Sequence, residues 1–136
     1  MGFLDKAINK TKSSLDSSSS KRTENKEVSK IESQIKEESA KVREKYEMIG
    51  KEYYRYTYDG DEAHKANFDK WIEEINESRK LIEECEAQIE EIKANGKAER
   101  ENIKAEAEAR AREIEEADQQ AKAEKAKEKR GKDDLF

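Results

Sequence analysis

The side chains that could take part in chemistry are few: one cysteine, one histidine and five tyrosines. All the tyrosines lie between residues 46 and 58. Aromatic rings beside basic groups can stack on nucleic-acid bases, but rings at the closed end of a helical hairpin can instead fill its apolar seam. Acidic side chains just after this window offset its basic ones, so we favour packing and expect no direct nucleic-acid binding. Tyr54 and Tyr58 fall outside the seam pattern and are predicted to be exposed.

The lone cysteine and the lone histidine give no catalytic or metal-binding pattern. A single Cys85 excludes an intramolecular disulfide and a cysteine-based zinc site. Its seam position is typical of a small buried residue, and His64 is interpreted as a surface residue near a helix start. Acid–base catalysis needs carboxyl groups held in a cleft, which solvated helix faces do not offer. We therefore predict no enzyme activity, no catalytic residue, no metal site and no cofactor.

Composition favours long solvated helices over a layered core, because 32% of residues are hydrophobic, 46% are charged and proline is absent. The net charge of −5 is small and does not by itself indicate a nucleic-acid partner. The sequence has no apolar run near the ~20 residues needed to span a bilayer, and it lacks the apolar stretch of a secretion signal. The expected location is the cytoplasm, with peripheral contact at the inner membrane surface as the alternative.

Two helical runs carry apolar residues at the spacing of a coiled-coil seam. Between them, Gly60 permits the positive φ of a tight turn, so a turn is predicted near residues 57–64. Such a short connection favours antiparallel neighbours. We therefore predict an all-α fold in which residues 23–95 form an antiparallel two-helix coiled-coil hairpin. The predicted seam comprises Val28, Ile31, Ile35, Val42, Tyr46, Ile49, Tyr53, Tyr56, Phe68, Trp71, Ile72, Ile75, Ile82, Cys85, Ile89 and Ile92.

The remaining segments are predicted to be separate from this hairpin. Residues 1–12 read as a short amphipathic helix, and the serine-rich residues 13–22 as a flexible linker that leaves it tethered but not docked. A helix end or break is expected at Asn95 and Gly96. Beyond it, residues 96–130 predict a charged Ala/Glu/Lys-rich helix that is mostly solvated, and residues 131–136 an acidic tip.

The N-terminal segment has the composition of a reversible membrane-surface anchor. Its apolar side chains are Phe3, Leu4, Ile8 and Leu15, and basic residues outnumber acidic ones around them. A basic amphipathic helix gains from apolar burial and from anionic lipid. We therefore treat an anionic membrane surface as an alternative partner.

The C-terminal tip supplies a third hypothesis. Its residues Asp133, Asp134, Leu135 and Phe136 look like the acidic tails by which bacterial single-stranded-DNA-binding proteins recruit partners. Leu135 and Phe136 would fill a small apolar pocket while the acids meet basic residues around it. This hypothesis makes the chain a DNA-metabolism accessory protein that recruits partners through its tip.

Several stretches together resemble a bacterial family. The start "MGFLDK", the serine-rich stretch, "EMIGKEYYRY" and "IEEIKANGK" resemble bacterial small zinc-ribbon proteins of unknown role, in which a helical hairpin leads into a ribbon with paired Cys-x-x-Cys motifs. The likeness covers about residues 1–95. The zinc ribbon is absent here, because no cysteine follows Cys85. The resemblance implies the hairpin and no metal chemistry.

Apolar neighbours widen the seam beyond what one pair of helices covers, as at Trp71 and Ile72 or Leu81 and Ile82. Two hairpins are therefore expected to associate into a homo-oligomer. The leading interpretation is a non-enzymatic helical interaction protein, a spacer or adaptor whose protein partners the sequence does not identify.

Overall fold

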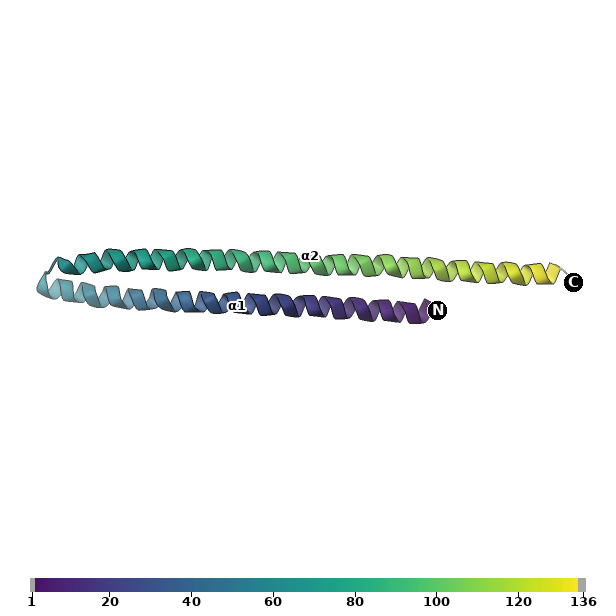
Figure 1. Cartoon of the computed structure of the whole chain (residues 1–136), viewed down its shortest axis with the longest axis horizontal. Coiled ribbons are helices and arrows are strands. Elements are labelled where there is room, and N and C mark those ends of the chain that lie inside the picture. Colours follow the sequence, from purple (N-terminus) through teal and green to yellow (C-terminus); the bar gives the residue numbers. More distant parts are fainter. Residues whose placement is uncertain (1, 135–136) are drawn as a thin grey trace. The chain divides into compact units, whose positions relative to one another are not determined.

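The fold is all-helical: two long helices pack against each other, and the described residues contain no strand. A computed structural model describes residues 2–134, with side chains for residues 2–131. Helix α1 spans Gly2–Asp59 and helix α2 spans Ala63–Asp134 (Figure 1). The described chain divides into two units. Glu24–Ala94 form the central unit, and residues 2–23 with residues 95–134 form the terminal unit.

The connection between the helices is made by Gly60 and by hydrogen bonds from its neighbours. Gly60 has a φ of 68°, which a residue without a Cβ adopts at little cost, and its N–H donates to the Tyr56 carbonyl at 2.8 Å. Asp59 Oδ1 accepts the Asp61 N–H at 2.8 Å, and Asp61 Oδ1 accepts the Ala63 N–H at 3.0 Å. The second bond satisfies a free donor at the start of α2. The predicted turn residue is therefore the one that has a positive φ in the short connection between the two helices.

The core of the central unit lies along one row of side chains on each helix. Val28, Val42, Ile75 and Cys85 are its buried apolar residues. Most of the other predicted seam residues are half-buried beside them, namely Ile31, Ile35, Ile49, Tyr56, Phe68, Trp71, Ile82, Ile89 and Ile92.

Three residues of the predicted seam lie outside it: Tyr46, Tyr53 and Ile72 are 49%, 59% and 47% exposed. The reason is helical register. Steps of seven from Ile31 lead to a charged row, and its members Glu38, Lys45 and Glu52 take the inner positions, with side-chain exposures of 16%, 26% and 11%. The prediction preferred Tyr46 and Tyr53, one position further along α1, and the backbone places them on the flank. On α2, Ile72 lies one position beyond the half-buried Trp71 and is on the flank for the same reason.

The serine-rich stretch is helical, in contrast to the predicted flexible linker. Residues 13–22 lie within α1, and Ser13, Ser17 and Ser20 are half-buried or buried. Serine has a lower helix propensity than alanine but does not break a helix, and its small side chain allows another helix to approach closely. The N-terminal segment is therefore docked on α2 within the terminal unit, and it is not merely tethered.

The predicted break at Asn95 and Gly96 is also absent from the structure, because α2 continues through both residues. Gly96 is buried. A glycine within a helix costs about 1 kcal/mol relative to alanine, so a single glycine does not have to end the helix. Helix α2 likewise continues past Gly131, where the sequence predicted a free tip, as far as Asp134.

Candidate functional site

In the terminal unit, α1 turns its polar side toward α2. Asn9 Nδ2 donates to the Ala107 carbonyl at 2.9 Å, and its Oδ1 accepts from Arg110 Nε at 2.8 Å. The Lys6 ammonium forms an ion pair with Glu115, and this contact raises the pKa of Lys6. The two helices in this unit are therefore joined by amides, small residues and an ion pair.

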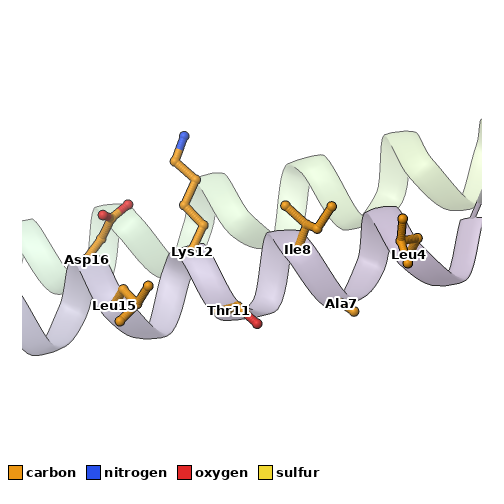
Figure 2. Close-up of a pocket in the computed structure, with 7 residues that line it drawn as sticks. All are labelled: Leu4, Ala7, Ile8, Thr11, Lys12, Leu15 and Asp16. Carbon is orange, nitrogen blue, oxygen red and sulfur yellow. The ribbon is translucent and has the colours of Figure 1, made fainter.

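The apolar side chains of the same segment point elsewhere. Phe3, Leu4, Ile8 and Leu15 are 87%, 65%, 59% and 61% exposed. We call these four residues the outer face. Figure 2 shows the last three of them along α1 together with Ala7 and Thr11. A helix normally buries its apolar side and solvates its polar one, so this segment is inverted and its outer face has no partner among the described residues.

The central unit has exposed apolar side chains on its flanks. Ile72 and Leu81 are 47% and 46% exposed, and Tyr46 and Tyr53 are about half exposed. Arg79 donates to the Tyr46 hydroxyl at 2.6 Å, and the Tyr53 ring lies 6.3 Å from the Phe68 ring. We call Tyr46, Tyr53, Ile72 and Leu81 the flank residues.

Tyr54 and Tyr58 are exposed, as the sequence predicted, with 70% and 85% of their surface accessible. Their rings stack on each other with centroids 6.4 Å apart and planes 25° apart. At this separation the two rings contact each other only loosely, and both remain open to solvent.

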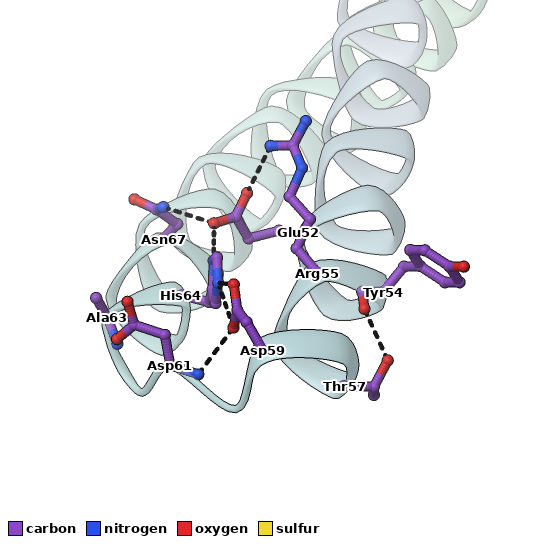
Figure 3. Close-up of polar contacts among 9 residues, drawn as sticks. All are labelled: Glu52, Tyr54, Arg55, Thr57, Asp59, Asp61, Ala63, His64 and Asn67. Carbon is purple, nitrogen blue, oxygen red and sulfur yellow. Dashed lines mark hydrogen bonds and ion pairs between the residues drawn. The ribbon is translucent and has the colours of Figure 1, made fainter.

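The end of the central unit contains a charged cluster that the sequence analysis missed. His64 Nδ1 lies 2.5 Å from Glu52 Oε1, and its Nε2 lies 2.9 Å from Asp59 Oδ2 (Figure 3). Both ring nitrogens face carboxylates, which accept hydrogen bonds when ionised, so the geometry favours the doubly protonated imidazolium. The side chains of His64 and Glu52 are 16% and 11% exposed.

The cluster shifts the pKa of each of its members. The hydrogen bonds that His64 donates to Glu52 and then to Asp59 raise the pKa of His64 above 6.5. The hydrogen bond from His64 lowers the pKa of Glu52, and Asn67 donates to the same carboxylate at 3.2 Å. The pKa of Asp59 is lowered chiefly by the Asp61 N–H and then by His64. The signal available in the sequence was the step of seven that places Glu52 on the inner row.

The sulfur of Cys85 is buried, and the only hydrogen-bond partner found for it in the described chain is Gln34 Oε1, at 3.7 Å. Within the described residues, no group of three or more His, Cys, Asp and Glu side chains is placed to hold a metal ion. No helix in the described part of the chain is long and apolar enough to cross a membrane. The tip hypothesis depends on Leu135 and Phe136, which lie outside the described residues, and on the side chains of Asp133 and Asp134, which lie outside the described side chains.

Comparisons of the chain with models of protein families, with curated proteins and with solved structures find no match. The resemblance to bacterial small zinc-ribbon proteins therefore stays a prediction. Functional conclusions about this chain have to come from its own surfaces.

Proposed function

We propose that the protein is a non-enzymatic helical interaction protein, a spacer or adaptor that associates with itself. The observation that carries this proposal is the half exposure of the flank residues, four large apolar side chains on a unit of two helices. Such a unit cannot cover large apolar side chains on its flanks alone, and a second copy would remove those on the flank it contacts from water.

An antiparallel coiled-coil hairpin is the architecture we propose for the central unit. Three contacts support it, because partners on α2 rise in number as those on α1 fall. Tyr53 lies beside Phe68, Lys45 pairs with Glu74 at 2.7 Å, and Gln34 contacts Cys85. A hairpin of this kind offers two long side surfaces to a partner, which suits a spacer.

The charged cluster supports the non-enzymatic part of the proposal. A general acid or base must be able to reach a substrate proton. In His64, both nitrogens are already taken by Glu52 and Asp59. The exposed carboxylates of Asp59 and Glu62 are likewise engaged, with the Asp61 N–H and with Lys65. These groups fasten the connection between the helices, which is a structural task.

Sedimentation equilibrium at tens of micromolar tests self-association. We expect the wild type to exceed the 15.8 kDa of one chain, and the double variant Ile72→Ser/Leu81→Ser to return to that mass, because it removes apolar surface from both flanks of α2 and so from a contact on either one. The matched control is Tyr54→Ser/Tyr58→Ser, which removes exposed side chains from the stacked pair and should leave the mass unchanged. A monomeric wild type would contradict the proposal.

A second candidate function, contact with a membrane surface, is favoured by the outer face. Its four apolar side chains sit on a helix whose polar side is already occupied by α2. A lipid interface can accept an amphipathic helix lying in its plane, with apolar groups buried and charged ends of side chains in water. Partial burial of each large apolar side chain would contribute up to about 1.5–3 kcal/mol, so four of them give a reversible contact.

Vesicle flotation tests this second function. We expect the full chain to float with lipid vesicles and the variant Leu4→Ser/Leu15→Ser to remain in solution, since it halves the outer face. The variant Tyr54→Ser/Tyr58→Ser is again the control and should float like the wild type. Equal flotation of the outer-face variant and the wild type would count against membrane contact through this face.

A further inference from the structure

A basic groove runs along one side of the terminal unit. Its volume is about 530 Å³, and its lining includes Lys10 on α1 with Lys97 and Lys104 on α2. Ser13, Ser14 and Ser17 line the groove from α1. Glu101 also lines it and supplies the acidic group. We call this feature the lysine groove.

The three lysines of the lysine groove have no acidic partner among the side chains that the structure describes. All three are exposed. Other lysines of the chain do find acids, as Lys45 does with Glu74 and Lys65 with Glu62. Like charges gathered along one groove raise the local potential and attract an anion. Serine hydroxyls beside them can donate hydrogen bonds to the oxygens of that anion.

The lysine groove and the outer face adjoin each other on α1. Residues 3, 10, 14 and 17 follow one another at helical spacings of seven, four and three, so Phe3 shares a row with Lys10 and two groove serines. The next row round the helix, at residues 4, 8, 11 and 15, carries Leu4, Ile8 and Leu15. A flat surface that receives Phe3 therefore also comes within reach of Lys10, whose long stem brings its charge to it. Lys97 and Lys104 line the same groove from α2.

We propose that the lysine groove binds phosphate groups of anionic lipids at a membrane surface. This inference rests on the membrane contact proposed above and adds which lipids it prefers. The apolar row enters the boundary of the acyl chains, and the ammonium groups of Lys10, Lys97 and Lys104 contact headgroup phosphates beside it. The terminal unit then binds membranes with a negative surface charge in preference to neutral ones.

The arrangement favours a lipid over the other carriers of phosphate. A nucleic acid presents a charged backbone, which offers no apolar surface to the four side chains of the outer face. The chain as a whole has a net charge of −5, which opposes a long polyanion. Free phosphate could contact the lysines of the open groove, but it would leave the apolar outer face exposed to water. A membrane satisfies the apolar row and the lysines at the same time.

The test measures binding of the full chain to vesicles of phosphatidylcholine alone and to vesicles in which a third of the lipid is phosphatidylglycerol. We expect the wild type to bind the anionic vesicles more tightly. The variant Lys10→Gln/Lys97→Gln/Lys104→Gln should lose on the order of 100-fold in affinity for anionic vesicles, because each lysine near such a surface is worth roughly fivefold. Its binding to phosphatidylcholine vesicles should not change.

The control variant is Lys30→Gln/Lys36→Gln/Lys80→Gln, which makes the same change in net charge at exposed sites in the central unit. It should bind both kinds of vesicle nearly as the wild type does. Far-UV circular dichroism confirms that each variant keeps its helix content. If the groove variant and the control lose affinity for anionic vesicles equally, the effect is one of net charge and the lysine groove is not the site.

The outcomes separate this inference from the function on which it rests. Wild-type binding to both kinds of vesicle with no effect of the groove variant overturns the lysine groove and leaves membrane contact standing. No wild-type binding to either kind overturns both. A few millimolar sodium phosphate is compared with sodium chloride at equal ionic strength. If only phosphate abolishes binding to anionic vesicles, the groove binds free phosphate, and the proposal of lipid binding is overturned. The proposal of lipid binding is also overturned if the wild type binds duplex DNA but no vesicles and the groove variant loses the DNA binding.

Discussion

At the scale of residues, the most constrained group is His64, held between two carboxylates near the connection of the helices. Glu52 comes from α1 and His64 from α2, so their contact fastens the two helices together at the end of the central unit. Arg55 and Asn67 also contact Glu52, at 3.4 Å and 3.2 Å. A charged pair in an inner position is stable only when both members find partners, and these neighbours supply them.

The pKa shifts in this cluster predict how its stabilisation depends on pH. The pKa of His64 is raised above 6.5, so its contribution is complete below that pH and is lost as pH rises through the folded-state value. The pKa of Glu52 is lowered below 4.5, so its contribution is present above that pH and is lost as pH falls through the folded-state value. The cluster therefore stabilises the fold most between pH 4.5 and pH 6.5, which are the ordinary pKa values of a glutamate and a histidine side chain.

The variant His64→Gln tests this pH dependence by thermal unfolding. We expect its midpoint to lie furthest below that of the wild type near pH 5.5 and to approach the wild type once the pH exceeds the raised pKa of His64, where the imidazole is neutral in both folded and unfolded chains. Lys51→Gln, at an exposed site nearby, serves as control and should show a constant difference. A His64→Gln difference that does not change with pH would contradict the imidazolium assignment.

At the scale of elements, the serine-rich segment shows what composition can and cannot predict. Its sequence predicted a linker because serine favours turns and caps when nothing packs against it. In the structure Ser13, Ser17 and Ser20 face α2. The contacts of Asn9 and Lys6 lie on the same side of α1. Sequence patterns along α1 reveal the apolar rows well, but they do not reveal that a polar row faces the other helix.

Substitution at exposed serines distinguishes a helix from a linker. Ser18 and Ser19 are exposed within α1, so Ser18→Ala/Ser19→Ala should stabilise the terminal unit by about 0.5 kcal/mol per site, and the matching glycine variant should destabilise it similarly. Amide hydrogen exchange over residues 13–22 should slow in the first variant and quicken in the second. Exchange at the rate of an unfolded chain in all three proteins would show that this segment is not helical.

At the scale of the whole molecule, the helical content and the turning point could be predicted from sequence, whereas the placement of polar residues could not. Sevenfold spacing located most inner residues of the central unit, and Gly60 located the turn. The preference for apolar side chains misplaced Tyr46 and Tyr53, because it ignored the charged row that Glu52 belongs to. The lysine groove was missed because Lys10 and Lys97 are far apart in sequence, and only the docking of the N-terminal segment brings them together.

The short connection between α1 and α2 also determines how the central unit folds. Only Gly60, Asp61 and Glu62 separate the two helices, so the contact of Tyr53 with Phe68 closes a small loop and costs little chain entropy. Each further contact between α1 and α2 can form next to one that already exists. No contact between residues far apart in the sequence has to form first. We therefore expect a zipper that starts at this connection, with the rapid kinetics that low contact order brings.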